Sequence, residues 1–402
     1  MRVLEINRYH ELEQLMHSIK VDPYAIKIMA PKALAYLIKI NSVSNIAANI
    51  LKQEILSLGG DAAIAKDAIT GKIKKTDCLL IANLSQFRSL HSKLSFQPFG
   101  LAKLAQDISL ALANYRRNDF TIELGKYKLN LEEGNTRIMG IVNLTPDSFS
   151  GDGLYKGREP RARGQEYIVE YAEQMVKDGA DLIDIGGESA RPGAKPVSLK
   201  EELGRVIPAL KALVKKIKVP ISVDTYKPEV AKQALSHGAV LVNDITGLRN
   251  PRMAEVIAEH KASVIIMHMK GTPQTMQKNP GYASLIDEVM EYLNKAINTA
   301  SSRGIDRQKI IIDPGIGFGK TIAHNLEILK GLKEFKVLGR PVMIGVSRKS
   351  FIGKILNAAP QERLNGTVAC CCLAAQNGAN ILRVHDVKAI KQALKVTGAV
   401  KK

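Results

Sequence analysis

The feature of this sequence that most restricts its fold is a series of eight short apolar runs, each followed by polar or charged residues. The runs occupy residues 138–142, 182–183, 221–223, 240–242, 264–267, 310–312, 342–344 and 381–382. Such runs, separated by amphipathic helical stretches, are typical of buried parallel strands with crossover helices. Eight of them in about 250 residues predict an α/β fold of the (β/α)8 TIM barrel type, with its active site at the carboxyl ends of the strands.

The segments between the runs support this alternation. Residues 201–215 carry apolar side chains at the spacing of one helical face, namely Leu203, Val206, Ile207, Leu210, Leu213 and Val214. Lys227-Pro228 and Asn250-Pro251 mark helix starts, because proline suits the first turn and asparagine can cap it.

The 402 residues exceed what one barrel needs, and the surplus precedes the barrel. We expect a small α/β domain over residues 1–118, with strands at 26–29 and 77–81 and helices at 49–57 and 101–114. No phosphate-binding glycine loop or metal-ligand spacing occurs there, so we assign it no chemistry. The barrel domain is expected to span residues 119–402.

Residues 119–133 alternate apolar and polar side chains about Gly125-Lys126. This pattern predicts a β-hairpin. Its place directly before the first barrel strand indicates that the hairpin plugs the amino end of the barrel.

The composition restricts the partners and the compartment. The net charge is +19, but the charges are spread and no basic arm or aromatic run accompanies them. We therefore expect a field that attracts anionic small molecules, and no nucleic acid. No apolar stretch is long enough for a membrane span, and the amino-terminal residues do not resemble a signal peptide. We therefore expect a cytoplasmic protein. The four cysteines lack zinc-type spacing, and the adjacent Cys370, Cys371 and Cys372 cannot readily pair with one another, so we expect reduced thiols.

Polar residues that follow the first and last strands predict an anion site. The first and eighth strands are neighbours in a closed barrel, so Asn143 can converge with Arg383 and His385. Amide, guanidinium and imidazole donors suit a phosphate or diphosphate. The oxygen of Asn143 could also face a Mg²⁺ ion that bridges the diphosphate.

A second group of polar residues follows the central strands. Asp224 and Asp313 are acceptors, Asn243 offers both donor and acceptor, and Lys349 donates. This set can pair with the amino-oxo edge of a guanine-like ring. A purely structural network of ion pairs is the alternative explanation.

Seven motifs carry a resemblance to one enzyme family. They are MGIVNLTPDSFS at 139–150, GGESARPGA at 186–194, VDTYKPEVA at 223–231, VNDITG at 242–247, DPGIGFGK at 313–320, GVSRKSFIG at 345–353 and RVHDV at 383–387. In this order, and at barrel spacing, they resemble the dihydropteroate synthases over about residues 119–402. That family condenses 6-hydroxymethyl-7,8-dihydropterin diphosphate with 4-aminobenzoate, and releases pyrophosphate, in folate synthesis.

The resemblance implies a role for each matching residue. The pterin pocket is implied to contain Asp224, Asn243, Met267, Asp313 and Lys349. The diphosphate and its Mg²⁺ are implied to contact Asn143, Arg383 and His385, with Asn143 as the metal ligand. The 4-aminobenzoate site and its covering loops are implied to contain Asp147, Ser148, Phe149, Arg191, Pro192, Phe318 and Ser347. The implied catalytic residues are Asp224, Lys349, Arg383 and His385. A homodimer through barrel helices is implied as well.

The sequence departs from the family at two loops. Ala190 stands where the family usually has threonine, and Gly151-Asp152-Gly153 replaces Asp-Gly-Gly. Both departures leave the pterin residues intact but bear on the affinity for 4-aminobenzoate. The amino-terminal domain is an addition to the common form.

Two other functions compete with this interpretation. A pterin-barrel methyltransferase, which passes a methyl group from methyltetrahydrofolate to a corrinoid protein, shares the barrel and part of the pocket. It needs no diphosphate site, so residues 347–350 and 383–385 favour the synthase. The other is a catalytically idle barrel that acts as a binding module, which the complete set of polar residues disfavours.

Overall fold

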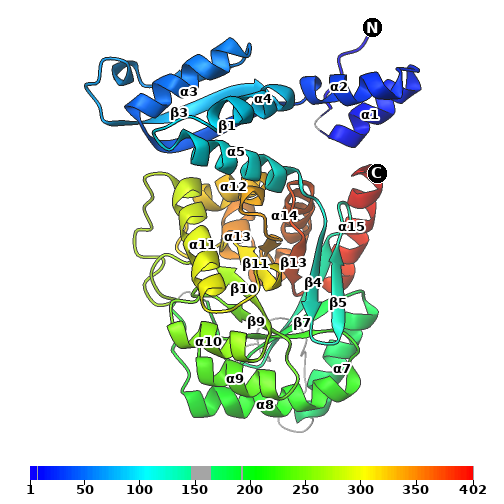
Figure 1. Ribbon diagram of the computed structural model, residues 1–402. Coiled ribbons are helices and arrows are strands. Elements are labelled where there is room, and N and C mark those ends of the chain that lie inside the picture. Colours follow the sequence, from blue (N-terminus) through cyan, green and yellow to red (C-terminus); the bar gives the residue numbers. More distant parts are fainter. Residues whose placement is uncertain (7, 146–163, 192, 402) are drawn as a thin grey trace. The chain divides into compact units, whose positions relative to one another are not determined.

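The computed structural model describes residues 1–6, 8–145, 164–191 and 193–401. The chain divides into two compact units, Met1–Asn114 and Tyr115–Lys402 (Figure 1). The division lies four residues before the boundary expected at residues 118 and 119. Each unit is described separately below.

The second unit contains an eight-stranded parallel sheet. Its strands are β6 (Arg137–Asn143), β7 (Leu182–Gly186), β8 (Ile221–Asp224), β9 (Leu241–Asp244), β10 (Ser263–Met267), β11 (Ile310–Asp313), β12 (Met343–Ile344) and β13 (Ile381–Val384). Their order is β11-β10-β9-β8-β7-β6-β13-β12, and a parallel bridge between Ile312 and Val342 joins the two ends. All eight apolar runs are strands, so the predicted TIM barrel is confirmed.

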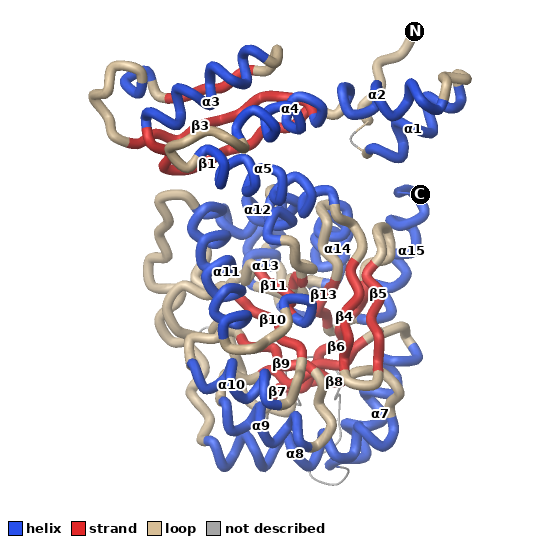
Figure 2. Tube along the Cα trace, viewed as in Figure 1, coloured by secondary structure: helices blue, strands red, loops and turns tan. Residues whose placement is uncertain are grey.

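Helices surround these strands, as Figure 2 shows. They are α7 (Gly164–Lys177), α8 (Leu199–Lys216), α9 (Pro228–Ser236), α10 (Pro251–Glu259), α11 (Leu285–Ser302), α12 (Ile322–Lys330), α13 (Ser350–Leu356), α14 (Leu364–Gln376) and α15 (Val387–Lys401). The predicted helix at 201–215 lies within α8. Both predicted helix starts are also confirmed, and the Asn250 side chain caps α10 by accepting from the amide of Arg252.

A hairpin closes the amino end of the barrel. Its strands β4 (Phe120–Leu124) and β5 (Tyr127–Leu131) pair antiparallel. Their buried side chains pack against the first inward-facing layer of the barrel, which comprises Met139, Leu182, Leu241, Ile265, Ile311, Met343 and Ile381. These seven strand residues are all apolar, while β8 contributes the buried Ser222, which pairs with Leu241. The predicted plug is confirmed, and the charged groups inside the barrel lie toward the carboxyl end.

The first unit is an antiparallel sheet covered by helices. Strands β1 (Ala35–Ser44), β3 (Lys75–Asn83) and β2 (Asp61–Ile64) lie in the order β1-β3-β2. Helices α3 (Asn45–Ser57), α4 (Leu84–Leu94) and α5 (Leu101–Arg116) share a core with this sheet, while α1 (Tyr9–Ser18) and α2 (Pro23–Ala33) form a separate small cluster. The predicted strand at 77–81 and the helices at 49–57 and 101–114 are confirmed.

The strand predicted at residues 26–29 is wrong, because these residues lie in α2. Asp22 caps this helix by accepting from the amides of Tyr24 and Ala25, and Pro23 occupies its first position. Ile26 and Ala30 are buried on one face, at helical spacing. A run of four apolar residues cannot by itself distinguish a strand from a helix, and the capping residues before it decide the outcome.

The sequence also predicts that the chain has no membrane span and that its cysteines are reduced. No helix in the described part of the chain is long and apolar enough to cross a membrane. All four cysteines are free thiols, and Cys78 and Cys371 are buried.

The division into units predicts that the second unit folds alone. Every barrel strand, the surrounding helices and the hairpin follow Asn114. A protein that begins at Tyr115 is expected to give the circular dichroism of a (β/α)8 barrel and one cooperative thermal transition. A shortened protein without a cooperative transition, under conditions where the full chain has one, would show that the first unit is needed for folding.

Candidate active site

The inward-facing layer at the carboxyl end of the barrel is polar, in contrast to the apolar layer at the amino end. Asp184, Asn243 and Asp313 are buried within β7, β9 and β11, and Asp224 ends β8. Strand pairing places Asp224 beside Asn243, and places Met267 beside Asp313. The barrel thus brings together the strand residues predicted for the pterin pocket.

Arg383 forms the centre of this layer. Its Nε donates to Oδ2 of Asp184 at 2.6 Å, and its Nη2 donates to Oδ2 of Asp224 at 2.7 Å. Asn243 Nδ2 donates to the same Asp184 oxygen at 3.0 Å. The exposed fractions of the side chains are 20% for Arg383, 0% for Asp184 and 13% for Asp224. One guanidinium therefore fixes two carboxylates that come from neighbouring strands.

The electrostatics of the layer follow from its burial. Burial raises the pKa of Asp224, the nearby Arg383 opposes this effect, and the charge of Asp184 adds to it. The two carboxylates raise the pKa of Arg383 despite its burial, so the guanidinium stays charged. The layer therefore holds the positive charge of Arg383 next to Asp224, whose ionisation depends on the charges of its neighbours.

Asp313 and Lys349 form the other side of the pocket. Burial raises the pKa of Asp313, whereas Lys349 and the amide of Gly315 lower it, and that amide donates to Oδ1 at 2.7 Å. Burial lowers the pKa of Lys349 to about 8, although Asp313 opposes the shift. Lys349 Nζ donates to the carbonyl of Ile316 and lies 4.7 Å from the ring centre of Phe318. This cation is therefore held close to Asp313 and can lose its proton in mildly alkaline solution.

Three buried polar atoms at the floor of the pocket have no hydrogen-bond partner among the described residues. They are Asp184 Oδ1, Ser222 Oγ and Asn243 Oδ1. Buried polar atoms are nearly always paired, so this floor has unused capacity for a ligand or for water.

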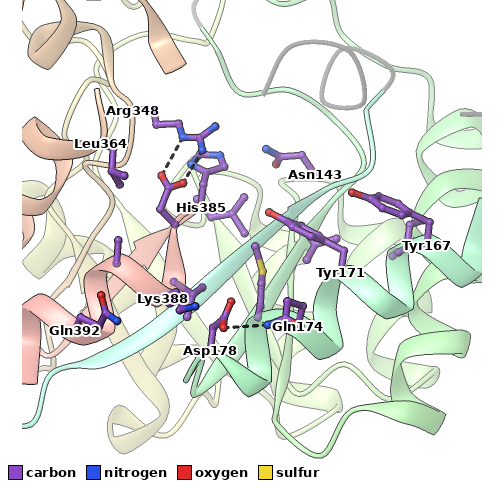
Figure 3. Close-up of a pocket in the computed structure, with 17 residues that line it drawn as sticks. Asn143, Tyr167, Tyr171, Gln174, Asp178, Arg348, Leu364, His385, Lys388 and Gln392 are labelled. Atoms are coloured by element: carbon purple, nitrogen blue, oxygen red, sulfur yellow. Dashed lines mark hydrogen bonds and ion pairs between the residues drawn. The ribbon is translucent and has the colours of Figure 1, made fainter. Parts of the chain in front are cut away.

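A cavity of about 440 Å³ begins at the ends of β6 and β13 and continues between α7 and α15. Asn143, Arg348 and His385 lie together at one end of it, and Tyr167 and Tyr171 line the α7 side (Figure 3). The predicted convergence of Asn143 and His385 is therefore observed. It follows from the pairing of β13 with β6.

His385 belongs to a second hydrogen-bonded group. Its Nδ1 lies 3.0 Å from Oγ of Ser347, and its amide donates to the same oxygen at 3.2 Å. Burial lowers the pKa of the imidazole to about 3, and the charges of Arg348 and Arg383 add to the shift. His385 is therefore neutral near pH 7 and can donate one N–H to an anion. Arg348 pairs with both carboxylate oxygens of Asp386, at 3.0 and 2.6 Å.

The three residues predicted for the diphosphate site do not all lie in one place. Asn143 and His385 line the cavity, whereas Arg383 is engaged by Asp184 and Asp224 at the floor. Ser347, which the resemblance places near the second substrate, contacts His385. Arg383 lies on β13, whereas His385 follows the last residue of that strand, and the guanidinium binds carboxylates of β7 and β8.

The loops expected over the second substrate are only partly described. Asp147, Ser148, Phe149, the segment Gly151-Asp152-Gly153 and Pro192 lie outside the described residues. Arg191 is exposed and acts on His385, whose pKa its charge helps to lower. Phe318 and Ala190 pack against an apolar cluster formed by Ile245, Met267, Met269 and Met276.

The residues present give limited support to a metal site. In the ranges that the structure describes, no three His, Cys, Asp or Glu side chains are grouped as a protein-bound metal would need. Asn143 supplies one neutral oxygen at the cavity, which suits a Mg²⁺ ion whose other ligands are diphosphate oxygens and water. The donor set therefore fits a metal that arrives with its substrate.

Sequence reasoning missed Asp184 as a site residue, although it ends one of the eight apolar runs. The available signal was a carboxylate inside a strand whose other residues are all buried. A buried charge needs a partner, so the burial of Asp184 predicts a cation on a facing strand. Only the closed barrel shows that the cation is Arg383.

Comparisons with known proteins agree with this geometry. The family described as "Pterin binding enzyme" matches residues 139–385. A dihydropteroate synthase of Synechocystis is 49% identical over 267 residues, which cover 66% of this chain and 90% of that protein. The solved structure of Xanthomonas albilineans dihydropteroate synthase with 4-aminobenzoic acid is 42% identical, covers 71% of this chain and 99% of its own, and has a TM-score of 0.64.

One relative also matches the amino-terminal unit. A probable bifunctional folylpolyglutamate synthase/dihydropteroate synthase of Halobacterium salinarum is 36% identical over 398 residues. The match covers 99% of this chain and 47% of that protein. The combination of the first unit with the barrel is therefore not unique to this chain.

The ion triad of Arg383, Asp184 and Asp224 predicts a stability effect. Asp184→Asn keeps the shape but removes a fully buried charge partner, so unfolding should become easier by about 2–4 kcal/mol. Urea unfolding measures the change. Asp107→Asn, which weakens an exposed ion pair with Lys103, is the control and should shift stability by less than about 0.5 kcal/mol. Equal stabilities of the two variants would show that the triad is not energetically coupled.

Proposed function

Because this chain belongs to the dihydropteroate synthases of the pterin-binding enzyme family, we propose that the polar layer at the carboxyl end of its barrel is where the two substrates are joined. The enzyme is a transferase of folate synthesis, and it condenses 6-hydroxymethyl-7,8-dihydropterin diphosphate with 4-aminobenzoate. The observation that carries the proposal is the convergence of Asp224, Asn243, Asp313 and Lys349 at one buried site.

The proposed pterin pocket uses the donor and acceptor pattern of this site. Asp224 and Asp313 accept the N–H groups of the ring, Asn243 pairs with its polar edge, and Lys349 donates to an acceptor. Met267 packs against the ring face. The unpartnered oxygen of Asn243 supports this assignment, because a ligand N–H would satisfy it.

The proposed diphosphate site lies where Asn143 and His385 meet the cavity, with Arg383 between it and the pterin floor. The neutral imidazole donates one N–H and the guanidinium supplies the charge. Asn143 would hold Mg²⁺, which on binding would neutralise diphosphate oxygens.

The reaction breaks the bond between the pterin methylene carbon and a diphosphate oxygen. The amine nitrogen of 4-aminobenzoate forms the new bond to that carbon and loses one proton, and pyrophosphate departs with the bonding electrons. Preorganised cations such as Arg383 stabilise the departing anion, and the carboxylate of Asp224 stabilises positive charge left on the dihydropterin. An arylamine is nucleophilic when neutral, so no strong general base is required.

The second substrate is proposed to lie at the apolar cluster against which Phe318 and Ala190, the residue before Arg191, pack. An aromatic ring suits this apolar wall, and Arg191 supplies a cation for a carboxylate. Asp147, Ser148, Phe149 and Pro192 stay proposed contacts by family resemblance. Ala190 offers a methyl group where the family resemblance implies the hydroxyl of a threonine.

We propose that the amino-terminal unit serves assembly or stability rather than chemistry. The polar layer, the cavity and the apolar cluster are all formed by residues after Asn114. On this proposal, the shortened protein that begins at Tyr115 keeps its turnover.

A homodimer through barrel helices is also proposed. Large apolar side chains are exposed on α12 to α15, among them Leu326, Ile355, Leu373 and Val396. Solvent-exposed apolar groups on adjacent helices favour burial against a partner. The free thiols further support a reducing, cytoplasmic location.

The proposed role of Asp224 predicts that its loss will lower kcat more than it changes the KM for the pterin diphosphate. Asp224→Asn keeps the shape but removes the negative charge, so kcat should fall about 100-fold, or ~3 kcal/mol, while the KM for the pterin diphosphate changes less than about tenfold. Pyrophosphate release with both substrates measures the turnover, and Asp107→Asn should behave as wild type. Equal changes in kcat and in pterin affinity would mean that Asp224 only binds.

The lowered pKa of Lys349 predicts a loss of pterin affinity in alkali. The ammonium that donates to the ring is present below about pH 8 and is lost as the pH rises through that value. The KM for the pterin diphosphate should therefore rise above pH 8. In Lys349→Met the KM should be high and nearly independent of pH from about 7 to 9. A wild-type profile that stays flat to pH 9 would argue against this role.

The proposed dimer predicts a change in mass. Leu373 is 52% exposed on α14, and Leu373→Asp should convert the dimer to a monomer in light scattering. Leu110→Asp, at a residue 59% exposed in the first unit, is the matched control and should leave the mass unchanged. A monomeric wild-type protein would refute the dimer.

A further inference from the structure

The loop between β7 and α8 is held at both ends by one side chain. This loop contains Ala190 and Arg191, which the proposed function places at the second substrate. Lys227, three residues after Asp224, contacts this loop from the start of α9. The proposed function assigns no role to Lys227.

The ammonium of Lys227 uses all three of its N–H donors. Nζ donates to Oε2 of Glu188 at 2.5 Å, to the carbonyl of Val197 at 2.6 Å and to Oε2 of Glu202 at 2.6 Å. Glu188 precedes Ala190 and Val197 lies near the end of the loop, whereas Glu202 belongs to α8. One cation therefore ties the start and the end of the loop to the helix that follows.

This contact is buried and charged. The exposed fractions are 18% for Lys227, 9% for Glu188 and 1% for Glu202. Burial alone would lower the pKa of Lys227, but the hydrogen bonds and charges of the two glutamates outweigh it and raise the pKa. The ammonium is thus present at every pH at which the enzyme would work. Without it, two buried carboxylates would face each other unneutralised.

The two residues before Lys227 reinforce the contact. Tyr226 donates its hydroxyl to Oε1 of Glu188 at 2.6 Å, and its ring packs with Ala190 in the apolar cluster. Thr225 donates to Oε1 of Glu202 at 2.7 Å. Burial and Glu188 raise the pKa of the Tyr226 hydroxyl, so it stays a donor. Both oxygens of Glu188 are therefore fixed by the consecutive residues Tyr226 and Lys227.

The loop so held reaches the active site. Arg191 is close enough to His385 for its charge to lower the pKa of the imidazole. The amide of Gly193 also donates to the carbonyl of Pro273, in the loop after β10, at 3.2 Å. A displacement of Glu188 or Val197 would move Arg191 and Ala190 while leaving the barrel strands in place.

We propose that Lys227 is a positioning residue for the second substrate: by holding Glu188 and Val197 it sets where Ala190 and Arg191 lie, and so determines the affinity for 4-aminobenzoate. The inference rests on the proposed function. Lys227 itself makes no hydrogen bond to Asp224, Asn243 or Asp313. The group reaches the pterin pocket only through the amide of Thr225, which donates to the carbonyl of Asn243 at 3.2 Å, and through the charge of Glu202, which raises the pKa of Asp224. The loss of Lys227 should therefore affect the pterin pocket less than the loop.

The test compares Lys227→Met with Lys227→Arg in the full-length enzyme, by steady-state pyrophosphate release. Lys227→Met removes the charge at similar length and should raise the KM for 4-aminobenzoate at least tenfold, with the KM for the pterin diphosphate within threefold of wild type. Lys227→Arg keeps the charge and should recover most of the affinity. Lys211→Met, the same substitution at an exposed position of α8, is the control and should behave as wild type.

Tyr226→Phe is the second variant, because it removes one hydrogen bond and leaves every charge paired. It should fold even if Lys227→Met does not, and it should raise the KM for 4-aminobenzoate about two- to fivefold. Hydrogen exchange supplies a readout that does not depend on activity. In Lys227→Met and Tyr226→Phe the amides of Gly193 and Ala194, which donate to Pro273 and Arg191, should exchange faster than in wild type, while those of β8 and β9 should not.

The outcomes separate this inference from the proposed function. Equal changes in both KM values, or a lowered melting temperature with both KM values unchanged, would show that Lys227 is merely structural. A folded wild-type protein that releases no pyrophosphate would instead contradict the proposed function. The exchange measurement would still decide whether Lys227 holds the loop.

Discussion

Closure of the parallel sheet governs the rest of this structure, because it brings together inward-facing side chains from strands that are far apart in the sequence. At the amino end these side chains are mostly apolar and pack against the hairpin of β4 and β5. At the carboxyl end the same alternation points Asp184, Asn243 and Asp313 inward. Closure also places β13 beside β6, so Asn143 and His385 reach one cavity from opposite ends of the barrel sequence.

Burying carboxylates in a barrel is costly unless a cation compensates them, and Arg383 does so for two of them. The same guanidinium lies between the floor of the pterin pocket and the residues proposed for the diphosphate. These ion pairs can therefore stabilise the fold and also take part in the reaction. The same charged groups that stabilise the layer would interact with a dihydropterin cation and with the departing pyrophosphate.

A second group of charges lies outside the barrel interior and acts on its loops. Lys227, Glu188 and Glu202 form a buried contact of one cation with two anions, and it fixes a loop rather than a pocket. Of the four residues from Asp224 to Lys227, the first lines the floor of the pocket, and Tyr226 and Lys227 bind Glu188 in the loop. Thr225 binds Glu202 at the start of α8.

The sequence by itself determined the barrel, the hairpin plug and the polar identity of most site residues, because strand runs, turn residues and motif spacing are local properties. It misassigned residues 26–29, where the capping contribution of Asp22 outweighed a short apolar run. It also gave no account of Asp184, of the turn of Arg383 toward two carboxylates, or of the reach of Lys227 across a loop. Only the tertiary structure decided these three contacts, because a side chain binds to groups that the closed barrel brings within hydrogen-bonding distance. The separation of two residues along the chain does not show which of these groups will become partners.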